Sequence, residues 1–132
     1  MNPVFWFEIP AKDRKKVGDF YAKAFGWKII PLDAKAGEYT VVHTSETDAD
    51  GMPKENNRIN GGIFKLTDEN KECANTPNIV VATGDINKTV NDIKAAGGTI
   101  LKGPYEIPGY GTYVLFEDTE GTRGAAMQPK MP

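Results

Sequence analysis

The chain repeats one pattern of apolar segments, and this repeat limits the folds open to it. A short apolar segment, "VFWFEI" (4–9), precedes an amphipathic stretch at 13–26, and "NIVVAT" (78–83) precedes a second one at 85–98. Three further strand-like segments, bounded by Gly, Pro, Asp or Asn, follow each amphipathic stretch. The sequence therefore predicts the order β-α-β-β-β twice, which is an α+β fold.

The two amphipathic stretches carry matching helix signals. Asp13 can cap the first helix and Gly26 can end it in the left-handed conformation. Asp85, 72 residues after Asp13, can cap the second helix, and Gly97 or Gly98 can end it. We therefore expect one module at about 3–66, a polar linker at about 67–76 and a second module at about 77–129.

Each module has one helix for a mostly antiparallel sheet, so one face of each sheet needs another partner. That partner is the second sheet, a ligand or another subunit. In the strand at 4–9, alternation places Phe5, Phe7 and Ile9 in an apolar row suited to the helix. Trp6 and Glu8 are then expected on the opposite face.

Two insertions interrupt the match between the modules. "ETDADGMPKENNR" (46–58) predicts a long polar loop in the first module. "GPYEIPGYG" (103–111) predicts a Gly/Pro-rich loop in the second, either a mobile lip over a ligand or part of a long hairpin with irregular turns.

Composition excludes several classes of protein. The formal charge is −2 and no Lys/Arg run stands out, so the basic surface of a nucleic-acid-binding protein is not expected. No apolar stretch is long enough to span a bilayer, so no membrane partner is expected. The single cysteine, Cys73, cannot form an internal disulfide, which fits a reducing compartment. We expect a cytoplasmic protein.

Three segments carry a family resemblance: "FEIPAKDRKKVGDFYAKAFGWKI", "GDINKTVNDIKAAGGTI" and "LFEDTEGTRGAAMQP". In their order and spacing they resemble the vicinal oxygen chelate superfamily of glyoxalases, bleomycin resistance proteins and extradiol dioxygenases, and most of all its small bacterial glyoxalase-like members. The resemblance implies curled, mostly antiparallel sheets that form a cup, the glyoxalase/bleomycin resistance fold, and a homodimer. In metalloenzymes of the superfamily, the first and last strands of each module supply the metal ligands, and the metal acts as a Lewis acid or redox centre.

The positions that would bind this metal hold poor donors. The resemblance aligns Trp6, Asn78 and Ala125 with ligand positions, and the fourth falls ambiguously within 61–64. Indole and methyl groups do not ligate, and an amide oxygen is a weak ligand. We therefore expect neither a metal nor another cofactor at the usual site. A rearranged site for a divalent metal, built from Glu8, His43 and Glu106, stays open.

Two main hypotheses for function remain. The first is a binding protein with a metal-free cup for a small aromatic or amphipathic ligand. This cup would be lined by Trp6, Tyr113 and Met127, and Glu8 and Asn78 would supply polar contacts to the ligand.

The second hypothesis is an enzyme, a lyase, isomerase or dioxygenase that uses a divalent metal at the rearranged site. Glu8 and His43 are the candidate acid–base groups, although Glu8 can equally form an ion pair and His43 a simple hydrogen bond. Pro10 stands near an arginine that binds the glutathione carboxylate in glyoxalase I, which argues against lactoylglutathione lyase activity. A purely structural or interaction role is the third option.

Overall fold

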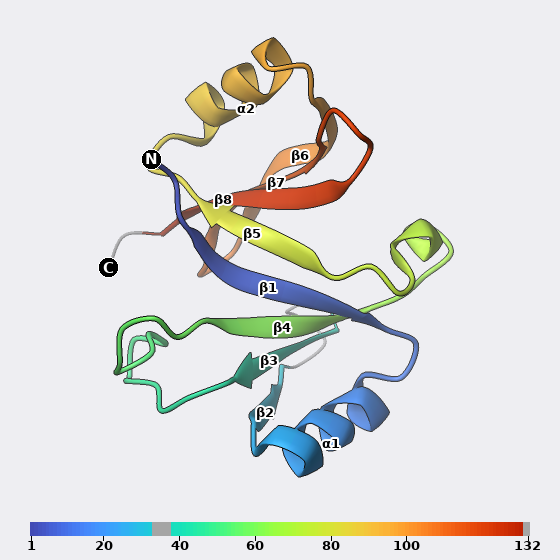
Figure 1. Ribbon diagram of the computed structural model, residues 1–132, viewed down its shortest axis with the longest axis vertical. Coiled ribbons are helices and arrows are strands. Elements are labelled where there is room, and N and C mark those ends of the chain that lie inside the picture. Colours follow the sequence, from blue (N-terminus) through green and yellow to red (C-terminus); the bar gives the residue numbers. More distant parts are fainter. Residues whose placement is uncertain (33–37, 131–132) are drawn as a thin grey trace. The chain divides into compact units, whose positions relative to one another are not determined.

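The computed structural model describes residues 1–32 and 38–130, and the chain divides into two compact units (Figure 1). The N-terminal unit is Trp6–Pro77 and the C-terminal unit is Met1–Phe5 with Asn78–Pro132. The elements of the first half are β1 (Val4–Ala11), α1 (Arg14–Phe25), β2 (Lys28–Pro31), β3 (Tyr39–His43), β4 (Asn60–Lys65) and the short 3₁₀ helix η2 (Lys71–Cys73). Those of the second half are β5 (Asn78–Ala82), α2 (Ile86–Ala95), β6 (Thr99–Ile107), β7 (Gly111–Glu117) and β8 (Arg123–Pro129). The predicted order β-α-β-β-β, repeated twice, is confirmed.

Both helices begin at the predicted caps. The Asp13 carboxylate accepts a 3.0 Å hydrogen bond from the Lys16 backbone N–H, and Gly26 ends α1 with a φ of 73°. The Asp85 carboxylate accepts the equivalent bond from the Lys88 backbone N–H, also at 3.0 Å. Neither helix, nor any other within the described part of the chain, is long and apolar enough to cross a bilayer.

The sheet of the N-terminal unit has the strand order β2-β3-β4-β1, with β1 parallel to β4 and the other neighbours antiparallel. Helix α1 packs against β2, β3 and β4. Phe7 and Ile9 pack on the same side, against the buried side chains of Val42 and Ile63. The prediction that Phe7 and Ile9 face the helix is confirmed.

The C-terminal unit repeats this arrangement in the strand order β5-β8-β7-β6, with β5 parallel to β8. Helix α2 covers β6, β7 and β8. Ile86 and Val90 of this helix pack against Val114 and Ala126, and both strand residues are almost fully buried. Each unit therefore has its own core between one helix and one face of a sheet.

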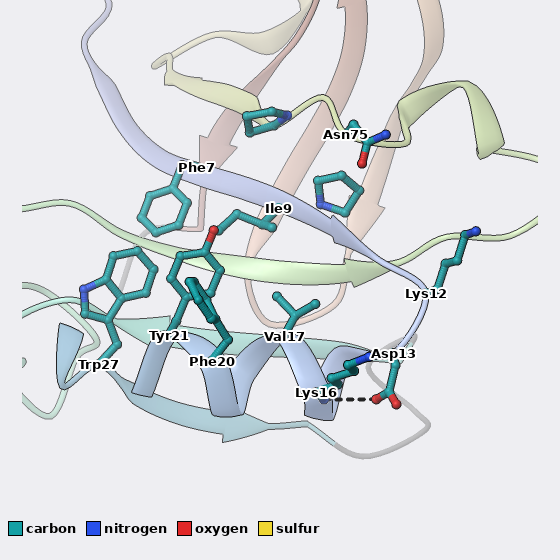
Figure 2. Close-up of a pocket in the computed structure, with 12 residues that line it drawn as sticks. Phe7, Ile9, Lys12, Asp13, Lys16, Val17, Phe20, Tyr21, Trp27 and Asn75 are labelled. Atoms are coloured by element: carbon teal, nitrogen blue, oxygen red, sulfur yellow. Dashed lines mark hydrogen bonds between the residues drawn. The ribbon is translucent and has the colours of Figure 1, made fainter. Parts of the chain in front are cut away.

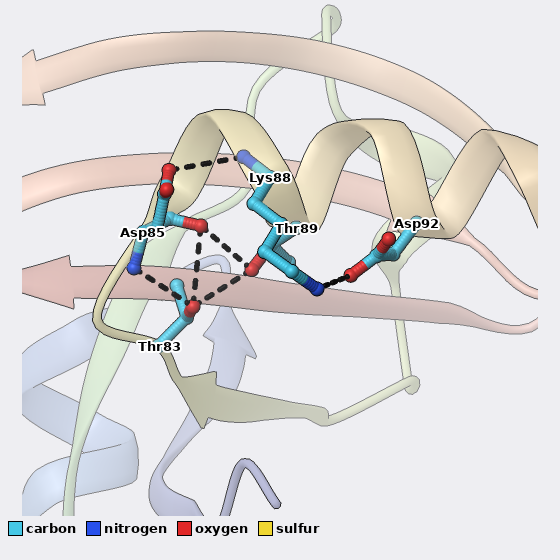
Figure 3. Close-up of polar contacts among 5 residues, drawn as sticks. All are labelled: Thr83, Asp85, Lys88, Thr89 and Asp92. Carbon is cyan, nitrogen blue, oxygen red and sulfur yellow. Dashed lines mark hydrogen bonds and ion pairs between the residues drawn. The ribbon is translucent and has the colours of Figure 1, made fainter.

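A cluster of hydroxyl groups fixes the start of α2 (Figure 3). The Thr83 and Thr89 hydroxyls lie 2.7 Å apart, and the Thr83 hydroxyl also accepts from the Asp85 backbone N–H at 3.2 Å. Farther along the exposed side of the helix, Lys88 forms an ion pair with Asp92 at 2.7 Å. Backbone donors that α2 cannot satisfy at its own N-terminus are thus bonded by neighbouring side chains.

One predicted loop is in fact largely strand. Residues 103–107 belong to β6, where Tyr105 pairs with Tyr113 and Glu106 with Thr112. The pairing of β6 with β7 shifts register on both sides of Lys102, so the strand accommodates glycine and proline at irregular positions. Of the two interpretations of 103–111, the long irregular hairpin is the correct one.

Candidate functional site

Three side chains form a hydrogen-bonded group on the face of the N-terminal sheet that the helix leaves uncovered, here called the helix-free face. The Trp6 indole N–H donates to the Tyr39 hydroxyl at 2.9 Å, and this hydroxyl donates to a Glu8 carboxylate oxygen at 3.0 Å. All three side chains are half-buried. The prediction that Trp6 and Glu8 lie opposite Phe7 and Ile9 is confirmed, and Tyr39 joins them.

Two adjacent glycines in β4 make room for two aromatic rings on opposite faces of the sheet. A Cβ atom on Gly61 would lie 2.7 Å from the Phe7 ring on the helix side, and one on Gly62 would overlap the Tyr39 ring and hydroxyl on the helix-free face. Gly62 is also the register partner of Glu8 in β1 and of Val41 in β3. The phenol of Tyr39 therefore fills the space that a side chain at position 62 would need.

The registers of the two units show which residue of β4 corresponds to Ala125 in β8. Glu8 pairs with Gly62, and Val80, its equivalent 72 residues later, pairs with Ala125. Gly62 is thus the counterpart of Ala125, just as Trp6 is the counterpart of Asn78. The four positions hold an indole, an amide, a hydrogen and a methyl group.

This donor set does not fit a divalent metal. Zinc and related ions need three or four good donors, and these positions offer one weak oxygen at Asn78. Among residues 1–32 and 38–130, no three side chains of His, Cys, Asp and Glu lie together as a metal-binding group. Glu106 pairs with Thr112, on the opposite face of its sheet from Tyr105 and Tyr113, and is exposed. Glu8 and His43 belong to the N-terminal unit and Glu106 to the C-terminal unit, so the rearranged site of these three residues stays a prediction.

His43 shares the helix-free face with Val41 and Tyr39, as its position in β3 predicts. It pairs in register with Lys28 and lines a small polar hollow of about 530 Å³. Burial lowers the pKa of His43 from its usual 6.5, and the Lys28 ammonium lowers it further. The imidazole is consequently neutral near pH 7, which suits a hydrogen-bonding group more than a cation.

The other predicted ligand-binding residues lie on the corresponding face of the C-terminal unit. Tyr113 and Met127 are register partners in β7 and β8, and the Tyr105 ring lies 5.5 Å from that of Tyr113. Asn78 is only 4% exposed, and its side-chain oxygen has no hydrogen-bond partner within the described part of the chain. A buried acceptor without a donor is costly, which sets Asn78 apart from the other buried polar side chains of this unit.

Sequence reasoning did not identify Tyr39. Its importance depends on the register of three strands, which no local pattern reveals. One local signal was present, because two consecutive glycines inside a strand often mark a close approach by another group. The pair Gly61-Gly62 is such a signal.

Comparison with known proteins agrees with this architecture. A family model described as "Glyoxalase/Bleomycin resistance protein/Dioxygenase superfamily" matches residues 4–123. The anthracycline biosynthesis proteins DauV of Streptomyces sp. (strain C5) and DnrV of Streptomyces peucetius are each 23% identical to this chain over 120 residues. The match covers 88% of this chain and 43% of each relative, so the chain spans less than half the length of these relatives.

Solved structures show the same fold at low sequence identity. A variant of the Streptomyces coelicolor methylmalonyl-CoA epimerase, in complex with 2-nitronate-propionyl-CoA, has a TM-score of 0.70 at 15% identity and covers 97% of both chains. A hypothetical protein from Bacillus halodurans has a TM-score of 0.67 at 12% identity, over 99% of this chain and 96% of its own. With the family model matching most of its length, the chain belongs to the glyoxalase/bleomycin resistance protein/dioxygenase superfamily.

Proposed function

We propose that this chain is a binding protein for a small aromatic or amphipathic molecule, which it holds without a metal ion. The single observation that carries the proposal is the group formed by Trp6, Tyr39 and Glu8. The resemblance to metalloenzymes of the superfamily aligns Trp6 with a ligand position, and the Tyr39 phenol fills the space that a side chain at Gly62 would need. We expect the ligand to bind through stacking and hydrogen bonds and not through chelation by a metal.

The chemistry of this group favours a planar ligand with a positively charged or hydrogen-bond-donating substituent. The indole of Trp6 offers a flat apolar surface for an aromatic ring or a cation. The Glu8 carboxylate, which already accepts from Tyr39, can take further donors because its two oxygens have about four acceptor sites. The names of DauV and DnrV connect those relatives with anthracyclines, which are planar aromatic compounds, and a ligand of that general shape fits the proposal.

Asn78, Tyr113 and Met127 are proposed to contribute to ligand binding from the helix-free face of the C-terminal unit. The side-chain oxygen of Asn78 has no partner among the described residues, which supports this role because a ligand N–H or O–H would satisfy it. The paired positions of Tyr113 and Met127 place an aromatic and a polarisable side chain next to each other. The effect of substituting each of these residues on ligand affinity should be measured in the same way as for Trp6, Tyr39 and Glu8.

Proflavine, a planar aromatic cation, is a suitable probe, and its fluorescence anisotropy measures binding. We expect saturable binding that Glu8→Gln weakens about tenfold, since a charge-assisted contact is lost. The matched control is Glu120→Gln, which removes one negative charge from an exposed turn. Equal binding by both variants, or tighter binding of anthraquinone-2-sulfonate, a planar anion, would contradict the assignment of Glu8.

The competing function is that of a lyase, isomerase or dioxygenase that uses a divalent metal. It would need a donor set other than the one at Trp6, Gly62, Asn78 and Ala125. The metal content of protein purified without chelators separates the two functions, because a metalloenzyme of this type holds about one ion per site.

We further propose a cytoplasmic homodimer, without nucleic-acid or membrane partners. The paired-module fold commonly dimerises in its superfamily, and the single cysteine fits a reducing compartment. Light scattering coupled to size-exclusion chromatography gives the molar mass, and a value of one chain at micromolar concentration would rule out the dimer.

A further inference from the structure

A second hollow lies on the helix side of the N-terminal unit, on the opposite face of the sheet from Trp6, Tyr39 and Glu8. It runs between β1 and α1 and has a volume of about 970 Å³ (Figure 2). We call it the α1 groove. Pockets that bind small molecules typically measure about 300–1,000 Å³, so its size suits a ligand rather than a few water molecules.

The walls of the α1 groove are mainly apolar. Phe7 and Ile9 face it from β1, and Phe20 and Tyr21 face it from α1. The ring of Tyr21 stacks on that of Trp27, with centroids 4.8 Å apart and an angle of 8° between the planes. Phe20 remains 58% exposed, so a large aromatic surface beside the groove is left in contact with water. An apolar body placed there would cover it.

One end of the groove is positively charged. Figure 2 shows Lys12 and Lys16 at the end away from Trp27, and neither ammonium forms an ion pair within the described part of the chain. Asp13 also borders this end, but its carboxylate accepts the capping bond from the Lys16 backbone N–H. The ammonium groups of two exposed lysines thus lie beside the apolar walls of the α1 groove.

Charge also distinguishes between possible occupants of the groove. The stretch 12–23 has a net charge of +3 in a chain whose formal charge is −2. Its charged residues are Lys12, Asp13, Arg14, Lys15, Lys16, Asp19 and Lys23. A two-fold contact through this surface would bring two such stretches together, and like charges across an interface are unfavourable. An anionic ligand meets no such repulsion.

We propose that the α1 groove binds a small amphipathic anion, a carboxylate with an aliphatic or aromatic body. The body lies along Phe7, Ile9 and Phe20, and the carboxylate lies at Lys12 and Lys16. This site is separate from the one proposed on the helix-free face, and each can fail without the other.

Decanoate is the probe, titrated below its micelle-forming concentration. The Trp6→Phe variant leaves Trp27 as the only tryptophan, so its fluorescence reports directly on the groove. We expect saturable binding of decanoate and binding of decanol and decylammonium that is weaker by about tenfold, since two ammonium–carboxylate contacts are lost or reversed. Affinity for decanoate should also fall as salt is added.

Two matched pairs of variants test the assignment. The double variant Lys12→Gln/Lys16→Gln should weaken decanoate binding about tenfold. The control, Lys15→Gln/Lys23→Gln, removes the same charge from α1 outside the groove and should change the affinity less than about twofold. Phe20→Ala should weaken binding and Phe25→Ala should not, although Phe25 is a similarly exposed ring at 63%.

Three results would overturn the proposal. The first is the absence of saturable binding, and the second is equal binding of decanoate and decylammonium. The third is a chain that does not bind decanoate but forms a dimer, where Phe20→Ala and Phe25→Ala each dissociate that dimer. The α1 groove would then belong to an interface between two copies of the chain. Circular dichroism of each variant verifies that α1 is intact.

Discussion

The Tyr39 phenol lies over the α-carbon of Gly62 and occupies the direction in which any side chain at position 62 would project. Its hydroxyl accepts from Trp6 and donates to Glu8, so both neighbours hold the ring in place. By strand register, position 62 is the counterpart of Ala125. A side chain at position 62 and the Tyr39 ring in this position therefore exclude each other.

Gly62→Ala should destabilise the protein by about 1–3 kcal/mol, since the new methyl group overlaps the Tyr39 ring and must displace it. Urea unfolding followed by circular dichroism measures the change. Gly84→Ala is the matched control, because no atom lies within 4 Å of a Cβ at that exposed position. In a Tyr39→Ala background the cost of Gly62→Ala should largely disappear, and an unchanged cost there would show that the two residues are not coupled.

Tyr39→Phe should lower the free energy of unfolding by about 1 kcal/mol, because the hydroxyl that joins Trp6 to Glu8 is removed. The fluorescence of Trp6 should also change as its N–H loses its partner. Tyr110→Phe removes a hydroxyl from a 49% exposed side chain and should have little effect. If both variants unfold at the same urea concentration as the parent chain, the hydrogen-bonded group contributes nothing to stability.

Local patterns predicted the elements of this fold well, and the caps show why. A carboxylate at Asp13 or Asp85 satisfies backbone donors within three residues, so the signal and its cause lie in the same short stretch. The alternation of Trp6 and Glu8 with Phe7 and Ile9 is equally local, because side chains of a strand alternate between its faces. The amino-acid sequence alone was therefore sufficient to predict these parts of the candidate site.

Tyr39 and residues 103–107 could not be predicted in this way. Tyr39 acts through Gly62 and Glu8, which belong to two other strands, and only the register brings them together. Residues 103–107 contain glycine and proline, which ordinarily favour loops, yet pairing with β7 holds them in a strand. In both cases, contacts between strands outweigh the preference of the local sequence.

Asp85→Ala should destabilise the protein by about 1 kcal/mol, since the bond that caps α2 is lost and the Lys88 backbone N–H is left without that acceptor. Thermal unfolding of this variant and of Asp92→Ala measures the difference. Asp92→Ala removes a carboxylate from the same helix but only breaks an exposed ion pair with Lys88, so a clearly smaller effect is expected. Equal losses of stability in the two variants would mean that removing a negative charge from α2, and not breaking the capping bond, causes the effect.

His43 should titrate below 6.5, because burial and the Lys28 ammonium both disfavour its protonated form. The folded state then binds the proton less readily than the unfolded state, so the contribution of His43 to stability is present above pH 6.5 and is lost as the pH falls through the lowered pKa. The chain has one histidine, and a single proton NMR signal follows its titration. Lys28→Gln should raise this pKa only part of the way, since burial is the larger cause, and a titration at or above 6.5 in the parent chain would contradict the assignment.

The central proposal is that Trp6, Tyr39 and Glu8 form a group that binds its ligand without a metal ion. The most direct test is elemental analysis of the protein purified without chelators and again after dialysis against zinc, nickel, manganese and iron salts. The chemistry of Trp6, Gly62, Asn78 and Ala125 predicts a metal content far below one ion per chain under both conditions. One tightly held ion per chain, retained through desalting, would contradict the claim.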